Sequence, residues 1–330
     1  MLMPASSPIR GRLAPSPTGA LHLGNARSFL LAWLSVRSRG GTVVMRIEDL
    51  DHPKVKPWAV SEILDDLRWL GLDWDEGPDV GGALGPYVQR ERCEQYAAAL
   101  EVLKEKGQVY PCVCSRRDVE SAQAAPHAED YQRYPGTCQG RFGSFADARA
   151  FLPSERLPAW RFQALDEAVG FEDGFCGYHG ANVAQRDGDF VLARDAQGAG
   201  YMLAVVVDDA AMGITEVLRG DDLLPATHRQ LLLYRALGLE PPRFVHVPLV
   251  VGPDGKRLAK RHGDTRLRVY REQGIAPERI TGFLAWSCGL IPFGMACRPT
   301  ELIADFSLDK LPHEPLVLTP ELVEQAGLSV

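Results

Sequence analysis

The chain has 330 residues, 45% of them hydrophobic and 24% charged, a composition that is ordinary for a globular protein and excludes a long disordered chain. The formal net charge of −7 at pH 7 excludes a general attraction to nucleic acid, so an RNA partner would need a local basic face. No apolar run approaches the roughly 20 residues of a membrane span, and residues 1–8 lack the pattern of a secretory signal, so we expect a cytoplasmic protein with no membrane partner.

The N-terminal third predicts an α/β fold with a parallel sheet. Residues 9–13 form a short segment that could be a strand, and residues 42–47 are β-branched and apolar, which favours a second strand. Residues 25–39 between them carry apolar side chains at helical spacing. A strand, a helix and a strand in succession form a βαβ unit, which implies a parallel sheet. Two further helices are predicted at 58–70 and 90–106.

The middle of the chain interrupts this pattern. Residues 109–189 contain clustered cysteines, several prolines and glycines, and short strand-like pieces such as 160–163, which is typical of an insertion with its own local structure. The α/β pattern then resumes, with strands at 190–193, 214–218 and 244–251 and helices at 201–212 and 226–237. After a polar loop at 252–264 the chain is predicted to be helical, most clearly at 277–288. We therefore divide the chain into a first catalytic half (1–108), an insertion (109–189), a second catalytic half (190–251) and a helical C-terminal region (252–330).

The densest chemical pattern connects the first strand to the first helix. It runs from Arg12 to Asn25 and includes His22, Gly24 and several prolines, but it is neither a Walker A loop nor a dinucleotide-binding glycine motif. Ligands bind at the carboxyl ends of parallel strands, and a helix N-terminus with glycines offers backbone N–H groups to phosphate. A plain turn in which His22 packs into the core is the alternative interpretation.

A second basic segment lies far downstream, at residues 256–263. It follows a predicted strand and contains Lys256, Arg257, Lys260 and Arg261. Such a loop could bring Lys260 onto phosphate oxygens as negative charge develops in a transition state. Taken alone, a basic run of this kind is more often a solvated surface.

Together, the two segments resemble the HIGH and KMSKS signatures of class I aminoacyl-tRNA synthetases. His22-Leu-Gly-Asn25 occupies the first and Arg257-Leu-Ala-Lys-Arg261 the second, with Asn25 and Ala259 departing from the consensus letters. Residues 12–25, 46–51 and 207–222 are similar to the glutamyl branch in particular. The resemblance implies a Rossmann-like parallel sheet that binds ATP with Mg²⁺. The implied ATP-binding residues are His22, Gly24, Asn25 and Lys260, of which His22 and Lys260 are the catalytic pair.

The same resemblance implies a pocket for L-glutamate. Its residues in this chain are Arg12, Ala14, Ser16, Glu48, Tyr201 and Arg219. Glu48 is a candidate acceptor for the substrate ammonium, and Arg219 would pair with the side-chain carboxylate, for which arginine has the best geometry. One position departs from the pattern, because Val205 stands where full-length glutamyl enzymes have an asparagine, and this predicts weaker glutamate binding.

Three cysteines in the insertion predict a zinc site. In a strand, Cys112 and Cys114 would point to the same face, and Cys138 follows further on. Three thiolates and one more donor complete a closed tetrahedral site of structural type. Chemistry alone favours His127 as the fourth ligand, whereas the family resemblance favours Tyr134, which we choose while keeping His127 open. Three free buried cysteines are the remaining alternative, since seven scattered cysteines argue against a disulfide framework.

The chain length and the residues that differ from full-length glutamyl enzymes indicate a particular family within the glutamyl branch. Only about 65 residues follow the second signature, too few for the anticodon-binding domain of a full-length glutamyl enzyme. The short chain, the Cys-x-Cys…Tyr-x₃-Cys pattern and Val205 resemble the glutamyl-Q tRNA(Asp) synthetase family. This implies an ATP-dependent enzyme that forms glutamyl-adenylate without tRNA and then transfers glutamate to queuosine in the anticodon of tRNA-Asp. No obligate protein partner is implied.

Three rival functions stay open. They are a truncated glutamyl-tRNA synthetase that charges the tRNA 3′ end, a catalytically silent tRNA-binding paralogue, and a nucleotidylyltransferase. Any RNA contact would be mostly electrostatic. The candidate contacts are Arg116, Arg117, Arg133, Arg141, Arg266 and Arg268.

Overall fold

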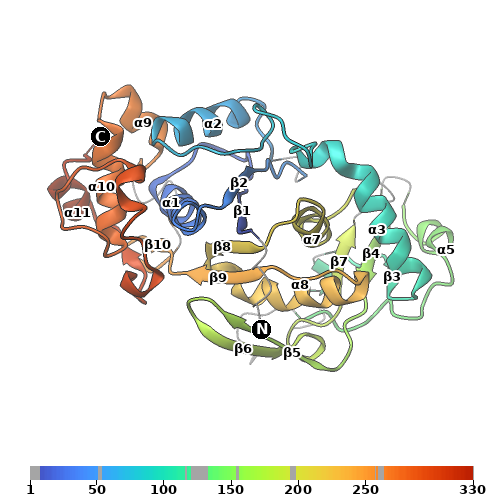
Figure 1. Cartoon of the computed structure of the whole chain (residues 1–330). Helices are drawn as coiled ribbons and strands as arrows, with labels where there is room; N and C mark the ends of the chain where they lie inside the picture. Colours follow the sequence, from blue (N-terminus) through green and yellow to red (C-terminus); the bar gives the residue numbers. More distant parts are fainter. Residues whose placement is uncertain are drawn as a thin grey trace, which may run out of the picture.

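A computed structural model describes residues 8–50, 54–115, 117–119, 133–153, 156–193, 198–256, 258 and 264–329. Its centre is a four-stranded sheet in the order β2-β1-β8-β9, in which every neighbouring pair is parallel (Figure 1). The strands are β1 (Arg10–Leu13), β2 (Thr42–Met45), β8 (Glu216–Gly220) and β9 (Arg243–Val247). The parallel pairing of β1 with β2 confirms the βαβ unit that the sequence predicts.

Helices cover both faces of this sheet. They are α1 (Leu23–Arg37), α2 (Ala59–Trp69), α3 (Cys93–Glu105), α7 (Tyr201–Ala211), α8 (Leu224–Leu237) and α10 (Pro277–Ser287). Because side chains alternate along a strand, Val43 and Met45 enter the core that contains α1 and α10, whereas Val44 enters the core that contains α7 and α8. A sheet buried on both faces is usual for parallel strands, and its carboxyl edge is left for ligands.

The insertion forms separate small sheets. These are the antiparallel sheet of β3 (Val109–Cys112), β4 (Ala159–Phe162) and β7 (Phe190–Ala193), and the hairpin of β5 (Ala168–Asp173) and β6 (Gly177–Asn182), with helices α5 (Phe145–Ala150) and α6 (Val183–Arg186). Two expectations change. The strand at 190–193, which the sequence analysis grouped with the second catalytic half, pairs with β4, and β3 ends at Cys112, so Cys114 lies just beyond the strand.

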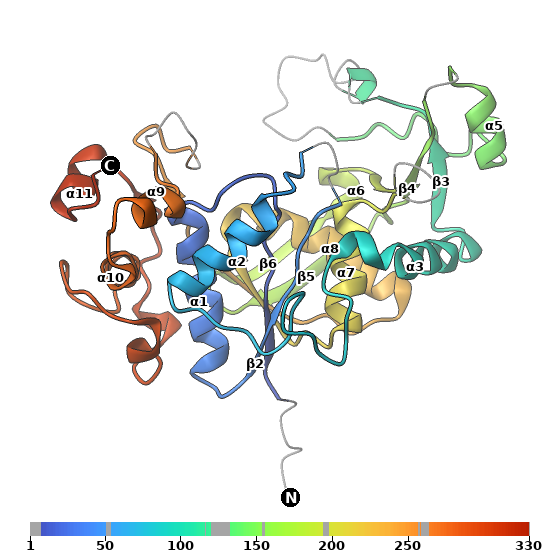
Figure 2. The same cartoon turned by 90° about the horizontal axis from the view of Figure 1, so that it is seen from above.

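The C-terminal region packs against α1, at the opposite end of the molecule from β3, β4 and α5 of the insertion (Figure 2). It also meets the insertion hairpin, where the ring of Phe175 stacks on His313. Besides α10 it contains α9 (Leu267–Glu272), α11 (Pro320–Gln325) and the parallel pair β10 (Val250–Val251) and β11 (Leu316–Val317). The single strand predicted at 244–251 is wrong. It divides at Pro248, which has no N–H for a ladder and whose carbonyl accepts from the buried Arg27 guanidinium at 2.5 Å, so β10 leaves the main sheet.

Short 3₁₀ turns complete the described elements, at Gln89–Arg92, Asp221–Leu223, Pro299–Leu302 and Leu308–Lys310. The first of them replaces the beginning of the helix predicted at 90–106. Within the described residues, no helix combines the length and the apolar character needed to cross a bilayer.

Candidate active site

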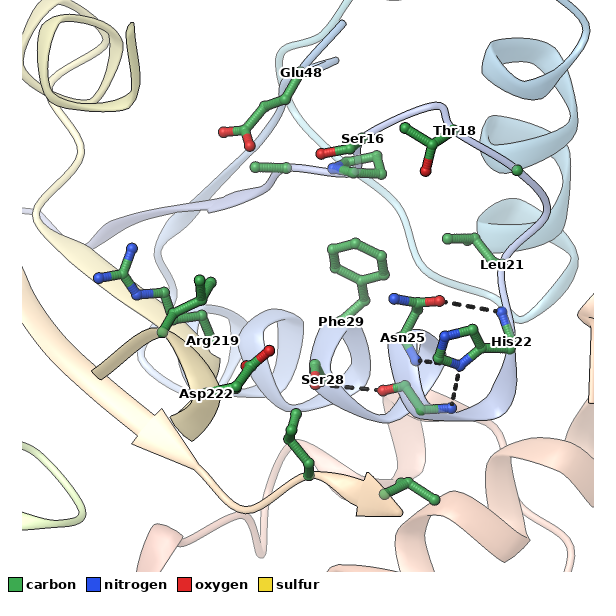
Figure 3. A pocket seen from close by; sticks show the side chains of 18 of the residues that line it. Ser16, Thr18, Leu21, His22, Asn25, Ser28, Phe29, Glu48, Arg219 and Asp222 are labelled. Carbon is green, nitrogen blue, oxygen red and sulfur yellow. Dashed lines mark hydrogen bonds between the residues drawn. The ribbon is translucent and has the colours of Figure 1, made fainter. Parts of the chain in front are cut away.

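A cavity of about 530 Å³ opens at the carboxyl ends of β1 and β8, beside the first turn of α1 (Figure 3). Its size suits a nucleotide or amino acid ligand. Its lining includes Arg12, Ala14, Ser16, His22, Gly24, Asn25, Glu48, Tyr201 and Arg219. The structure thus brings together every residue that the sequence analysis assigned to ATP or glutamate except Lys260, which lies outside the described residues.

His22 forms the N-cap of α1. Its Nδ1 accepts from the backbone N–H of Gly24 at 3.2 Å and of Asn25 at 3.4 Å, while the Asn25 side chain accepts from the His22 N–H at 3.3 Å (Figure 3). A ring nitrogen that accepts carries no proton, so the neutral imidazole holds its proton on Nε2. His22 borders the cavity rather than packing into the core. The result is a helix N-terminus, with its partial positive charge, next to an imidazole N–H donor.

The described residues that flank Lys260 in the sequence lie beside the chain around His22. Val250, before it, lines the cavity. After it, the Leu23 N–H donates to the Thr265 carbonyl at 3.0 Å, and the Leu267 N–H donates to the Leu21 carbonyl at 2.9 Å. Described residues on both sides of the second motif therefore lie beside the first motif, although more than 200 residues separate the two motifs in the sequence.

Arg219 on β8 is a buried cation held only by neutral groups. Its Nε donates to His246 Nε2 at 3.0 Å, and its Nη2 donates to Thr227 Oγ1 at 2.8 Å and to Gln230 Oε1 at 2.7 Å. Its Nη1 has no hydrogen-bond partner, and among the described residues no carboxylate forms an ion pair with it. Burial lowers the pKa of Arg219 from its ordinary value. An unpaired buried cation is costly, so this arrangement favours an anionic ligand.

Glu48 lies on a different wall of the cavity from Arg219 (Figure 3). Its carboxylate accepts from Arg46 at 2.9 Å, and Arg46 in turn pairs with Asp209 at 2.7 Å. Desolvation raises the pKa of Glu48, and the charges of Arg46 and Arg12 oppose this rise. A carboxylate with a buried cation behind it and a cavity in front of it can accept hydrogen bonds from a ligand ammonium.

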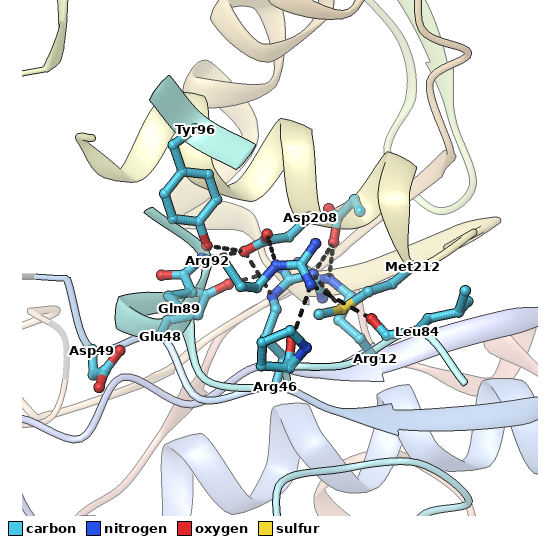
Figure 4. Close-up of polar contacts among 12 residues, drawn as sticks. Arg12, Arg46, Glu48, Asp49, Leu84, Gln89, Arg92, Tyr96, Asp208 and Met212 are labelled. Atoms are coloured by element: carbon cyan, nitrogen blue, oxygen red, sulfur yellow. Dashed lines mark hydrogen bonds and ion pairs between the residues drawn. The ribbon is translucent and has the colours of Figure 1, made fainter. Parts of the chain in front are cut away.

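Behind Glu48 lies a buried network that the sequence analysis did not anticipate (Figure 4). Asp208 accepts from Arg92 at 2.6 Å, from the Tyr96 hydroxyl at 2.8 Å and from Gln89 at 2.9 Å. Its members come from α3, α7 and the turn before α3, so no local pattern in the sequence could have united them. The network fixes the wall from which Glu48 projects.

Val205, the departure from the glutamyl pattern, is buried in α7 at 1% exposure and is not among the residues that line the cavity. Weaker glutamate binding caused by this residue stays a prediction.

The three insertion cysteines converge on one point with Tyr134. The thiols of Cys112, Cys114 and Cys138 lie within 4.8 Å of one another, and the Tyr134 hydroxyl lies 3.5 Å from Cys112 Sγ and 3.8 Å from Cys114 Sγ. A tetrahedral zinc ion with bonds of about 2.3 Å spaces its ligand atoms about 3.8 Å apart, so the donor set fits zinc. The Arg161 guanidinium lies 3.7 Å from the centre of the Tyr134 ring and makes a cation–π contact with it. His127 lies outside the described residues.

The arginines proposed for RNA contact fall into two groups. Arg266 pairs with Asp264, and Arg268 pairs with Glu62 at 3.2 Å and with Glu272 at 3.3 Å, so both are engaged within the protein. Arg117, Arg133 and Arg141 on the insertion are exposed, while Arg116 lies outside the described residues. The insertion is therefore the better candidate for a basic RNA-contacting face.

Comparison with known proteins agrees with this geometry. Residues 8–296 match the family "tRNA synthetases class I (E and Q), catalytic domain". A glutamyl-Q tRNA(Asp) synthetase of Symbiobacterium thermophilum is 49% identical, and the match covers 95% of this chain and 97% of that protein. A glutamate–tRNA ligase 2 of Syntrophus aciditrophicus is 42% identical over 91% of this chain but only 62% of its own length. The crystal structure of a glutamate–tRNA synthetase from Elizabethkingia anophelis aligns with a TM-score of 0.82 at 28% identity, over 97% of this chain and 70% of that one.

Proposed function

The chain belongs to the glutamyl-Q tRNA(Asp) synthetase family of class I tRNA synthetases, and on that premise we propose that it activates L-glutamate with ATP and transfers it to queuosine in the anticodon of tRNA-Asp. It is an enzyme of the ligase type. The observation that carries the proposal is one cavity that joins a helix N-terminus suited to phosphate with a buried arginine, which pairs with no carboxylate among the described residues.

In the proposed first step, ATP lies over the first turn of α1. Gly24 and Asn25 border its phosphates, and His22 donates from Nε2. The family resemblance assigns Lys260 to the same phosphates. Magnesium enters bound to the ATP phosphates and offsets part of their charge. The helix N-terminus, His22 and Lys260 stabilise the charge that develops on the α-phosphate.

Glutamate occupies the other end of the cavity. Arg219 binds its side-chain carboxylate, Glu48 accepts from its ammonium, and Arg12, Ala14, Ser16 and Tyr201 complete the binding site. The ionised α-carboxylate attacks the α-phosphorus and pyrophosphate leaves, so this step needs no general base. In the second step a queuosine hydroxyl attacks the adenylate carbonyl, and AMP leaves. ATP and tRNA are substrates of the cytoplasm, where we place the reaction.

The decisive experiment compares tRNA-Asp with and without queuosine. We expect radiolabelled glutamate to enter acid-precipitable RNA only with the queuosine-containing tRNA. Transfer to tRNA-Glu is the matched test of a truncated glutamyl-tRNA synthetase that charges the 3′ end. Equal labelling of the two tRNA-Asp preparations would contradict the proposal. A lack of glutamate-dependent exchange between pyrophosphate and ATP would instead favour a silent tRNA-binding protein.

We also propose one structural zinc ion, with Cys112, Cys114, Tyr134 and Cys138 as its ligands, on the strength of their convergence. Four protein ligands leave no open position, so zinc would hold the insertion together rather than take part in the chemistry. Elemental analysis of the purified protein should find about one zinc per chain. Cys138→Ser should release it, whereas Cys93→Ser, outside the cluster, should retain it. A metal-free wild type would refute the site. Loss of zinc in His127→Ala would show that His127, and not Tyr134, is the fourth ligand.

A further inference from the structure

His246 lies directly beside Arg219, because the two residues are partners in the parallel register of β8 and β9. The imidazole is fully buried. Its Nε2 faces the Arg219 Nε–H at 3.0 Å, and its Nδ1 faces Asp173 Oδ2 at 2.6 Å. A guanidinium can only donate, so Nε2 must accept and the ring proton must lie on Nδ1, where Asp173 accepts it. Both neighbours thus select the same tautomer.

Asp173 is itself firmly held at the end of β5. Its Oδ1 accepts from the backbone N–H groups of Phe175 at 2.9 Å, Cys176 at 2.9 Å and His246 at 3.1 Å. Although burial opposes it, the hydrogen bonds from His246 and from these N–H groups hold the pKa of Asp173 below its ordinary value. The carboxylate therefore orients the imidazole from a fixed position.

The arrangement keeps a negative charge one residue away from Arg219. Had Asp173 paired with the guanidinium directly, the protein would have neutralised the cation itself. A neutral imidazole occupies the Nε edge instead, and Thr227 and Gln230 occupy Nη2. These three acceptors fix the plane of the guanidinium and leave Nη1 unpartnered, at a residue that lines the cavity.

We propose that His246, oriented by Asp173, is a positioning residue that aims the Arg219 guanidinium at the side-chain carboxylate of glutamate. The inference rests on the proposed function, because it assigns glutamate to this cavity. If it holds, His246 on β9 and Asp173 on the insertion hairpin also determine the affinity for glutamate. Neither residue lines the cavity. Both therefore act through Arg219, which His246 contacts directly and also by way of Thr227, whose hydroxyl lies 3.1 Å from His246 Nε2.

The test measures glutamate and ATP affinities separately by titration calorimetry, which requires no turnover. In His246→Asn the side-chain amide can still donate to Asp173 but is too short to accept from Arg219. We expect the Kd for glutamate to rise about 10- to 100-fold, as for a lost hydrogen bond to a charged group, and the Kd for ATP to stay within about twofold. The matched control is His228→Asn, a buried histidine on α8 that contacts Arg186 instead of Arg219 and should leave both affinities unchanged.

Asp173→Asn is the second variant, because it preserves shape but no longer dictates the tautomer. It should weaken glutamate binding in the same direction, and the double variant should be no weaker than His246→Asn alone, since the two residues act in series. Unchanged glutamate affinity in both single variants, or an equal loss of ATP affinity, would overturn the inference. A wild type that binds glutamate but performs no exchange would overturn only the proposed function, and a wild type that binds no glutamate would overturn both.

Discussion

His22 serves two purposes with its two ring nitrogens. Nδ1 caps α1 by accepting from the backbone of Gly24 and Asn25, and this fixes the proton on Nε2, at the edge of the cavity. The helix cap and the proposed donor are therefore separable by mutation, although they belong to a single side chain.

His22→Asn tests this separation. An asparagine oxygen can replace Nδ1 as the cap, so the thermal midpoint should change by no more than a few degrees, but the variant has no donor at the position of Nε2. The rate of glutamate-dependent pyrophosphate exchange should fall about 100-fold or more, as on removal of one transition-state donor. His22→Ala, which removes both nitrogens, is the comparison and should lose stability as well. Full exchange activity in the asparagine variant would exclude the donor role.

The residues that motifs could reveal are those close together in sequence. Residues 12–25 could be predicted as one wall of the site because a strand, a turn and a helix follow each other directly. Glu48 and Arg219 could be located only through resemblance to a family. His246 and Asp173 carry no local pattern, since their relation to Arg219 depends on the register of β8 with β9 and on the placement of a hairpin. That information resides in tertiary packing.

At the scale of elements, α9 is fastened to α2 by ion pairs. Arg271 on α9 pairs with Asp66 on α2 at 3.2 Å, and Arg268 pairs with Glu62. Asp66 is fully buried, and burial raises its pKa to about 6. Because α9 follows Lys260 in the sequence, this contact holds the described residues just after that motif against the body of the protein.

This pKa has a consequence for stability. The folded state binds the Asp66 proton more tightly than the unfolded chain does, so protonation of Asp66 adds to the free energy of unfolding. This added stability is complete at low pH and is lost as the pH rises from about 4 to about 6. Asp66→Asn lacks this titration. Between pH 4.5 and pH 7.5 the wild type should therefore lose about 1–2 kcal/mol more of its free energy of unfolding than the variant does. Urea titrations at both pH values measure this. Asp305→Asn, which removes an exposed carboxylate of the C-terminal region, is the control. An identical pH dependence in wild type and Asp66→Asn would refute the assignment.

Helices and strands were predictable where their periodicity was unbroken, as in α1, α7 and α10. The error at 244–251 has a physical cause, because apolar composition continues across Pro248 while the hydrogen-bond ladder cannot. Likewise, Cys114 joins Cys112 although it lies beyond the strand that was expected to hold both. Composition indicates which residues are buried, but it does not state which sheet a strand joins.

At the scale of the molecule, an anionic protein is proposed to bind an anionic RNA. The net charge of −7 means that attraction must come from a restricted face, and the exposed Arg141 of the insertion, which packs over the rings of Phe142 and Phe151, is our candidate. In the proposed mechanism, glutamate and ATP meet inside the cavity and do not depend on that face.

The two half-reactions should therefore respond differently to salt. Raising KCl from about 50 to about 200 mM should raise the KM for tRNA by tenfold or more while leaving pyrophosphate exchange within about twofold. Arg141→Ala should weaken transfer without altering exchange, whereas Arg298→Ala, an exposed arginine of the C-terminal region, should alter neither. Equal salt sensitivity of exchange and transfer would argue against a separate electrostatic face.

The hairpin β5–β6 limits how much of this chain can be deleted without loss of the proposed glutamate site. By sequence it belongs to the inserted segment, yet Asp173 contacts His246 of the main sheet, and the Gly174 N–H donates to the Phe244 carbonyl at 2.9 Å. An engineer who excised residues 109–189 to obtain a minimal adenylating core would also remove the support beneath Arg219. The insert is consequently not a detachable module, and a trimmed version must retain the hairpin or supply a substitute for its carboxylate.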